Sequence, residues 1–127
     1  MNRSKRANHY GTICEKRAFK RYDLKPARAS WKDAEFKNGK PVEIKSTMLR
    51  HADGNAGTFK LYDTAHGRLR RSDGSYVFVV YRTPDSDRVD VVDMKMVHSS
   101  RLPRLSWHGG GAHRDMRQSK LGISEIF

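Results

Sequence analysis

The sequence predicts an α/β fold in which a central mixed sheet is flanked by helices. Three stretches of the chain indicate it. Residues 8–22 carry small and apolar side chains at helical spacing, and residues 76–81 form the most apolar segment, rich in β-branched and aromatic residues. Asn38-Gly39 separates two segments in which apolar and polar residues alternate, which is typical of a β-hairpin. A helix, a hairpin and a buried strand in this order predict a layered α/β domain.

The composition limits the classes of function. With 127 residues the chain is long enough for one domain with its own core. Lys and Arg number 26 against 14 Asp and Glu, a net charge of +12, and such a basic folded chain most often binds nucleic acid. The alternatives are a solvated basic surface and a ribosomal-type structural protein.

The cysteine count and the hydropathy pattern indicate a location. Cys14 is the single cysteine, so a disulfide framework is excluded and a zinc site built on cysteines is not expected. No run of residues reaches the length of a membrane span, and no apolar segment follows the basic N-terminus as it would in a signal peptide. We therefore expect a cytoplasmic protein without a membrane partner, either nucleoid-associated or a viral protein in the host cytoplasm.

The first helix is expected over residues 8–22, with Asn8 as its N-cap, after a basic N-terminal arm of residues 1–7. Its small and apolar positions gather on one arc of the helix, namely Gly11, Cys14, Ala18, Phe19 and Tyr22. Glu15 falls inside this arc, and a carboxylate that faces the core needs a partner. Two interpretations are open: a salt bridge to an arginine, or a carboxylate turned toward the acidic residues of the hairpin.

The loop length decides which hairpin residues share a face. A three-residue loop of Lys37, Asn38 and Gly39 pairs Asp33 with Glu43, and Gly39 supplies the positive φ that the last loop position needs. This register puts an apolar set on one face, Ala34, Phe36, Val42 and Ile44. It puts a charged set on the other, Asp33, Glu35, Glu43 and Lys45. A two-residue loop would mix the two faces, so the three-residue loop is favoured.

The remaining elements follow from local patterns. A short strand is expected at residues 28–31, before the hairpin. An extended stretch at 58–62 leads into a helix over 63–71. Residues 76–81 are expected to be a central strand that is buried on both faces, and residues 88–97 to be the next strand.

The C-terminal residues differ in character from the rest. The predicted core spans residues 8–97, and residues 98–127 are expected to be a basic, glycine-containing C-terminal arm. We expect this arm to lie over the surface as a loop and hardly to add a second core. Its apolar residues, Ile123, Ile126 and Phe127, are expected to dock back onto the domain.

The charged face of the hairpin carries the chemistry. Asp33 and Glu43 form a cross-strand pair of like charges, which is destabilising unless a cation lies between them. A divalent metal ion meets this condition, and Lys45 lies on the same face. The set D-x9-E-x-K holds what phosphodiester hydrolysis needs: carboxylates for an oxygen-loving metal, here Mg²⁺ or Mn²⁺, and a basic group beside the attacking water. The alternative is a solvated strand face with ordinary charges.

These residues receive separate roles. Asp33, Glu43 and the carbonyl of Ile44 are the predicted metal ligands, and Lys45 is the group on the water side. Glu15 completes the shell or helps to hold a second metal, so the predicted catalytic set is Glu15, Asp33, Glu43 and Lys45. Glu35 lies on the same charged face and is either a ligand or a spectator.

The motif residues resemble those of a known family. Glu15 on the first helix, Asp33 at the start of the hairpin, the run Glu43-Ile44-Lys45-Ser46 and the strand at 76–81 are similar to the PD-(D/E)XK nuclease superfamily, which has the restriction-endonuclease-like fold. In size and layout the chain most resembles archaeal Holliday-junction resolvases. The resemblance implies an αβββαβ core, Mg²⁺-dependent DNA cleavage and a homodimer.

The chain also departs from the family pattern. Lys32 stands where many members have a proline, and the gap from Asp33 to Glu43 is shorter than in the resolvases. No glutamine lies on the expected second helix, where Lys60 or His66 is the nearest substitute. These departures bear on the prediction of the DNA substrate more than on the prediction of phosphodiester hydrolysis.

The sequence therefore predicts a divalent-metal-dependent DNA endonuclease that acts on branched DNA. A sequence-specific restriction-type or homing-type endonuclease is the alternative within the class, and a non-catalytic DNA-binding module is the alternative outside it. Basic residues near both ends of the chain and on the second helix are the expected phosphate contacts. They are Lys5, Arg6, Arg68, Arg70, Arg71, Arg101, Arg104 and Arg114, with Arg117 and Lys120 as further candidates.

Overall fold

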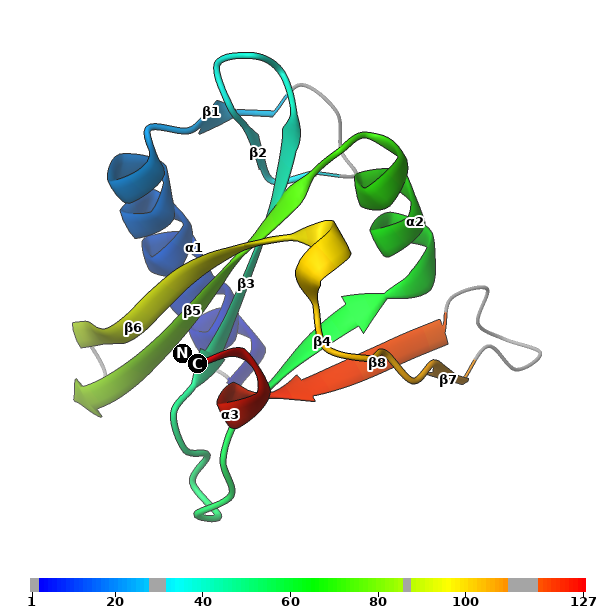
Figure 1. The fold of residues 1–127 in the computed structure, drawn as a ribbon. Helices are drawn as coiled ribbons and strands as arrows, with labels where there is room; N and C mark the ends of the chain where they lie inside the picture. Colours follow the sequence, from blue (N-terminus) through cyan, green and yellow to red (C-terminus); the bar gives the residue numbers. More distant parts are fainter. Residues whose placement is uncertain (1–2, 28–31, 86–87, 110–116) are drawn as a thin grey trace.

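A computed structural model of the chain describes residues 3–27, 32–85, 88–109 and 117–127, and of residues 3–8 the backbone alone. Its elements are, in chain order, α1 (Arg3–Tyr22), β1 (Lys25–Pro26), β2 (Ala34–Glu35), β3 (Pro41–Met48), β4 (Thr58–Tyr62), α2 (Asp63–Arg71), β5 (Ser75–Asp85), β6 (Arg88–His98), the 3₁₀ turn η1 (Ser99–Arg101), β7 (His108–Gly109), β8 (Arg117–Gly122) and α3 (Ile123–Ile126). Figure 1 shows how these elements are arranged.

The central sheet has five strands in the order β1-β2-β3-β5-β6. β3 and β5 run parallel, whereas the other neighbours in this sheet are antiparallel. Residues 76–81 of β5 are all buried between β3 and β6, which confirms the predicted central strand. The predicted mixed α/β fold with a sheet flanked by helices is confirmed.

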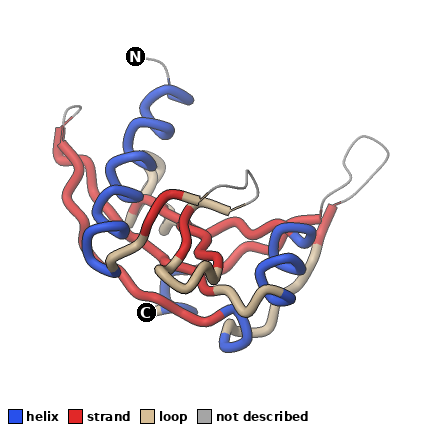
Figure 2. The backbone as a smooth tube through the Cα atoms, turned by 90° about the horizontal axis from the view of Figure 1, so that it is seen from above, coloured by secondary structure: helices blue, strands red, loops and turns tan. Residues whose placement is uncertain are grey.

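The two faces of this sheet bury two separate apolar clusters, because side chains alternate along each strand. On one face, Val42, Ile44 and Val77 pack with Cys14 and Ala18 of α1. On the other face, side chains from β4, β5, α2, β8 and α3 pack together, including Phe59, Leu61, Leu69, Tyr76, Phe78, Leu121 and Ile126. Figures 1 and 2 show α1 and α2 on opposite sides of the molecule. Glu43, the one carboxylate of β3, can therefore face only one of these clusters.

The first helix is longer than the sequence pattern indicates. It begins at Arg3, whereas the prediction placed its start at Asn8. The preceding residues include Arg, Lys and Ala and contain neither Gly nor Pro, so nothing in them stops the helix. The predicted inner arc is confirmed, since Cys14 and Ala18 are fully buried and Phe19 and Tyr22 pack at the edge of the same cluster.

The hairpin has the predicted three-residue loop. Ala34 pairs with Val42, and the N–H of Phe36 donates to the carbonyl of Lys40. Gly39 has a φ of +86°, the left-handed conformation that the loop required. The predicted register is confirmed, and with it the side of the sheet on which each β3 side chain lies.

Gly39→Ala is expected to lower the free energy of unfolding by about 1 kcal/mol, because a Cβ is disfavoured in the left-handed region. An added Cβ would meet no atom within 4 Å, so the cost is purely conformational. Urea unfolding measures it. Gly67→Ala is the matched control: Gly67 lies inside α2, where the same change is expected to stabilise the protein by about 0.5 kcal/mol. A Gly39→Ala protein as stable as wild type would contradict this account of the loop.

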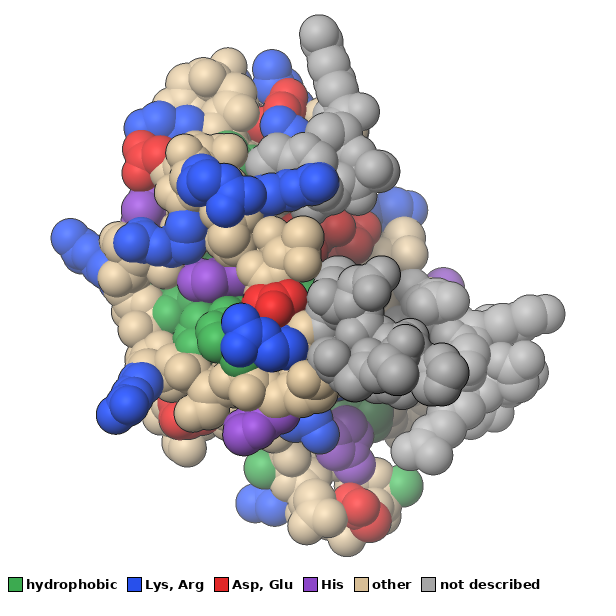
Figure 3. All heavy atoms as spheres, turned by 90° about the vertical axis from the view of Figure 1, so that its right-hand side faces the viewer, with side chains coloured by type: hydrophobic (Ala, Val, Ile, Leu, Met, Phe, Trp, Pro, Cys, Tyr) green, Lys and Arg blue, Asp and Glu red, His purple; other side chains and the backbone are tan. Residues whose placement is uncertain are grey.

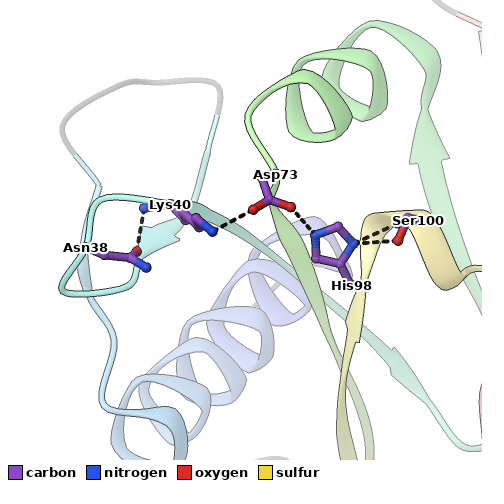
Figure 4. Close-up of polar contacts among 5 residues, drawn as sticks. All are labelled: Asn38, Lys40, Asp73, His98 and Ser100. Atoms are coloured by element: carbon purple, nitrogen blue, oxygen red, sulfur yellow. Dashed lines mark hydrogen bonds and ion pairs between the residues drawn. The ribbon is translucent and has the colours of Figure 1, made fainter.

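A polar network fixes the hairpin loop against the central sheet. The ammonium of Lys40 donates to Asp73 at 2.6 Å, and Nε2 of His98 lies 2.7 Å from the other oxygen of Asp73. The hydroxyl of Ser100 lies 2.7 Å from Nδ1 of His98, and the N–H of Ser100 also donates to this nitrogen. Figure 4 shows Asp73 between Lys40 and His98. The network joins the β2–β3 loop, the turn before β5 and the end of β6.

The C-terminal residues add a strand that the sequence pattern did not reveal. β8 pairs with β4 in a three-stranded sheet of the order β4-β8-β7. Leu121 and Ser119 are buried, so the expectation of a surface loop that hardly adds to the core is wrong. The expected docking of Ile126 is confirmed, whereas Phe127 stays 36% exposed.

The other elements follow the prediction closely. The extended stretch at 58–62 and the helix at 63–71 coincide with β4 and α2, and β6 extends the predicted strand by one residue. The predicted strand at 28–31 lies outside the described residues. Among the helices that the structure describes, none is long and apolar enough to cross a membrane.

Candidate active site

Glu43 and Lys45 lie on the face of β3 that points away from α1. They alternate with Val42 and Ile44, which are buried under that helix. The ammonium of Lys45 lies 3.6 Å from a carboxylate oxygen of Glu43, and their side chains are 20% and 16% exposed. Both groups are therefore largely covered and still reach solvent, as groups that act on a ligand must.

Asp33 joins them from the point where β2 begins. Its N–H donates to the carbonyl of Val42 at 3.2 Å, and its carboxylate accepts the N–H of Ile44 at 2.8 Å. The Asp33 carboxylate thus accepts the hydrogen bond that a backbone carbonyl of a neighbouring strand would otherwise accept from the N–H of Ile44. This arrangement brings the carboxyl groups of Asp33 and Glu43 together, as the hairpin register requires.

The pKa of Glu43 reflects its burial and the charges of Asp33 and Lys45 beside it. Burial is the main cause that raises the pKa of Glu43 to about 7, and the negative charge of Asp33 raises it further. The charge of Lys45 acts in the opposite direction but does not cancel the effect. Near neutral pH Glu43 is therefore partly protonated, and a positive charge between the two carboxyl groups would relieve their repulsion.

Glu15 approaches the same pair from α1. Burial raises the pKa of its carboxyl group, and the charge of Asp33 raises it further. This coupling to Asp33 favours the interpretation in which Glu15 faces the acidic residues of the hairpin.

Glu35 is engaged elsewhere. Its buried carboxylate lies 2.6 Å from the ammonium of Lys32 and 3.8 Å from that of Lys25. Two lysines thus neutralise it at the β1–β2 edge. Of the two roles that the sequence left open for Glu35, this geometry favours the spectator.

The donor set suits a small, oxygen-loving metal ion. Asp33 and Glu43 supply two adjacent carboxylates, and Mg²⁺ is usually held by one or two carboxylates together with water and substrate oxygens. Among the described residues, no three acidic, His or Cys side chains converge closely enough to form a complete metal cage. The residues fit a metal that keeps open positions for water and phosphate.

Two tyrosines beside the site, Tyr62 and Tyr76, were not predicted as part of it, whereas His66 was predicted as a substitute for the glutamine that the second helix lacks. The ring of Tyr62 has the Lys45 ammonium 5.3 Å from its centroid. Tyr76 is the register neighbour of Glu43 on β5, and burial, followed by the charge of Glu43, raises the pKa of its phenol. His66 on α2 has Nδ1 2.8 Å from the hydroxyl of Tyr76, and its ring lies 5.7 Å from that of Trp107. Parallel pairing of β3 with β5 would have pointed to Tyr76, but no local signal marks Tyr62.

Basic side chains surround α2. Arg68, Arg70 and Arg71 are exposed in its last turn, and Arg101 and Arg104 are exposed on and after η1. Figure 3 shows Lys and Arg side chains over the face on which α2 lies. Of the further candidates, Lys120 is exposed and Arg117 is paired with Asp63 at 3.0 Å. The side chains of Lys5, Arg6 and Arg114 lie outside the described residues.

A mixed sheet with Glu43 and Lys45 on β3 and Asp33 beside them at the start of β2 is consistent with the restriction-endonuclease-like fold. The chain belongs to the PD-(D/E)XK nuclease superfamily: the family model of the PD-(D/E)XK nuclease superfamily domain matches residues 1–127. Members of this superfamily are generally nucleases that use divalent metals. Comparisons with curated protein sequences and with solved structures found no significant match. The narrower resemblance to archaeal Holliday-junction resolvases therefore remains a prediction.

Proposed function

We propose that the protein is a divalent-metal-dependent endonuclease that hydrolyses phosphodiester bonds in DNA. One observation carries this proposal: Asp33, Glu43 and Lys45 meet on one largely covered face of the hairpin. The match to the nuclease superfamily over residues 1–127 supports it. On a solvated strand face Glu43 would be exposed, whereas its side chain is only 16% exposed here and its carboxyl group lies close to that of Asp33.

Each residue of the site has a separate proposed role in metal binding. Asp33 and Glu43 hold Mg²⁺ or Mn²⁺, and the carbonyl of Ile44 is the third ligand. The N–H of Ile44 points to Asp33, and within a strand the N–H and C=O of one residue point to the same side. The Ile44 carbonyl therefore faces the carboxylates rather than β5. Glu15 lies near Asp33 but does not converge with Asp33 and Glu43 into one cage, so its proposed role is to help hold a second metal.

When bound, the metal lowers the pKa of an attacking water and stabilises the charge that develops on the phosphate. Lys45 places a positive charge beside that water. From this position its ammonium orients the water and stabilises the oxygens of the pentacovalent phosphorus.

Branched DNA is the proposed substrate, and a homodimer that places two sites on one DNA is the proposed assembly. The net charge of +12 and the arginines near α2 support a nucleic-acid substrate. A sequence-specific restriction-type or homing-type endonuclease is the second candidate. The aromatic residues around His66 favour it, because Tyr76 and Trp107 offer a shaped surface beside the cutting site.

A panel of DNA substrates tests the proposal. Wild type is incubated with four-way junctions, flaps, single strands and linear duplexes in Mg²⁺ or Mn²⁺, beside Glu43→Ala and Lys45→Ala. We expect wild type to cut the junction fastest, Glu43→Ala to cut nothing measurable and Lys45→Ala to cut about 10²-fold to 10³-fold more slowly than wild type. Cleavage of linear duplex at fixed positions would favour the second candidate. If no DNA is cut, or if the variants cut as well as wild type, the proposed function is wrong.

DNA binding is expected to weaken steeply with salt, because each phosphate contact releases a counterion. If the five exposed arginines near α2 all contact phosphates, the slope of log K against log salt concentration is about −4.5. Fluorescence anisotropy in Ca²⁺ or EDTA measures it. Arg70→Ala and Arg71→Ala should each reduce the slope by about 0.9. Arg82→Ala is the matched control, since Arg82 is exposed on the distant part of β5. A slope near zero would refute phosphate contacts as the basis of binding.

A further inference from the structure

Lys45 has two neighbours of different kinds. On one side its ammonium lies 3.6 Å from an oxygen of Glu43. On the other side it lies 5.3 Å from the centroid of the Tyr62 ring, within the distance at which an aromatic ring attracts a cation. The lysine is thus held between a carboxylate and an aromatic ring.

Metal binding is expected to weaken the attraction of Glu43 for the Lys45 ammonium but not that of the Tyr62 ring. A carboxylate that ligates a divalent metal directs its charge to the metal, so Glu43 attracts Lys45 less once a metal is bound. A lysine side chain that is free to move has many rotamers, and fixing it in one of them costs conformational entropy. The Tyr62 ring has no such competing partner, so its attraction for the ammonium persists when the metal is present.

The position of Tyr62 is itself fixed from the C-terminal strand. Tyr62 is the last residue of β4 and pairs with Gln118 of β8. The next residue, Asp63, accepts a hydrogen bond from Nε of Arg117 at 3.0 Å and another from the N–H of Arg117 at 3.2 Å. β8 therefore holds the end of β4, and with it the ring beside Lys45.

We propose that Tyr62 is a positioning residue that keeps the ammonium of Lys45 beside the metal site, with β8 as its support. This inference rests on the proposed function, because it gives Tyr62 a role through a lysine that acts on the scissile phosphate. It also gives a reason for the C-terminal strand to be part of the nuclease fold: the strand reaches the active site through Tyr62.

The test compares Tyr62→Leu, which removes the ring, with Tyr62→Phe, which keeps it. Single-turnover cleavage at saturating DNA and Mg²⁺ is expected to be about tenfold slower in Tyr62→Leu and within about twofold of wild type in Tyr62→Phe. The affinity for DNA, measured in Ca²⁺, is expected to be unchanged in both. A merely structural role for the ring would also be rescued by Phe, but Tyr62→Leu would then weaken DNA binding and lower the unfolding midpoint together with the rate, whereas the positioning role slows the rate alone.

An NMR measurement tests the contact between Tyr62 and Lys45 without relying on cleavage. In protein with labelled lysines, the ε-methylene protons of Lys45 are expected to be shifted upfield by the ring of Tyr62, in the presence and in the absence of Mg²⁺. Lys45→Arg assigns the signal. The ring-current shift is expected to persist in Tyr62→Phe and to disappear in Tyr62→Leu.

The outcomes separate this inference from the proposed function. If wild type cuts DNA and Tyr62→Leu cuts as fast, or if wild type shows no upfield shift with Mg²⁺ bound, the role of Tyr62 is refuted while the nuclease assignment stands. If Tyr62→Phe is as slow as Tyr62→Leu, the ring is not what matters and the inference fails. If wild type cuts no DNA, the proposed function fails, and the positioning role falls with it.

Discussion

Glu43→Gln is expected to abolish cleavage and at the same time to stabilise the protein at pH 8 by about 2 kcal/mol. The pKa of Glu43 is raised from 4.5 to about 7, mainly by burial. A shift of this size corresponds to roughly 2 to 3 kcal/mol that the folded state loses when the group ionises. Gln removes this cost, and its amide can donate a hydrogen bond to Asp33.

The sign of the pH dependence follows from the raised pKa. Below pH 4.5 Glu43 is protonated in both the folded and the unfolded state, so it contributes no pH dependence. Between pH 4.5 and about 7 the folded state binds more protons than the unfolded state, so wild-type stability falls as the pH rises. The stability difference between Glu43→Gln and wild type is therefore expected to be small at pH 4.5 and full at pH 8.

Urea unfolding of both proteins at these two pH values measures the effect. Asp73→Asn is a control of opposite sign, because hydrogen bonds from Lys40 and His98 hold the pKa of Asp73 below its usual value. Its carboxylate contributes stability above pH 3.8 that is lost as the pH falls, so Asp73→Asn is expected to destabilise the protein at pH 8. A Glu43→Gln protein less stable than wild type at pH 8 would show that Glu43 is not a strained carboxylate.

Lys45→Ala is expected to lower the single-turnover rate of DNA cleavage by about 10²-fold to 10³-fold, the usual effect of removing a charge that stabilises a transition state. The affinity for Mg²⁺ is expected to remain, since Asp33 and Glu43 are untouched. Quench-flow kinetics measures the rate, and calorimetric titration measures metal binding. This combination separates a group that acts on the phosphate from a group that holds the metal.

Lys20→Ala is the matched control for this change. Lys20 is exposed on α1, far along the chain from the hairpin, and has the same charge as Lys45. Its removal is expected to leave the cleavage rate within about twofold of wild type. If Lys45→Ala and Lys20→Ala slow cleavage equally, Lys45 contributes only to the general positive charge of the protein.

The parts of this structure that the sequence predicts are those set by local rules. Gly39 needs a positive φ, the loop length follows from it, and the pleat then places Glu43 and Lys45 on one face and Val42 on the other. The borders of β4 and α2 also follow from local patterns. The hairpin face of the site was therefore predictable residue by residue.

The missed parts depend on contacts between distant segments. β8 has the sequence RQSKLG, which shows little alternation of apolar residues, and its burial comes only from pairing with β4. The contact of Tyr62 with Lys45 depends on this pairing. The raised pKa of Glu43 depends mainly on the burial of Glu43 by the elements packed on that face of the sheet. No local signal carries the first two contacts, because they join residues more than fifteen positions apart in the chain.

Metal-dependent cleavage by the wild-type protein is the most direct test of the Asp33–Glu43–Lys45 site. The measurement is single-turnover cleavage of an end-labelled four-way junction with the protein in excess, in Mg²⁺, in Mn²⁺ and in EDTA, each repeated with Glu43→Gln. We expect cleavage by wild type in either metal, none in EDTA and none by the folded Glu43→Gln protein. Cleavage in EDTA, or equal cleavage by Glu43→Gln in Mg²⁺, would contradict the account.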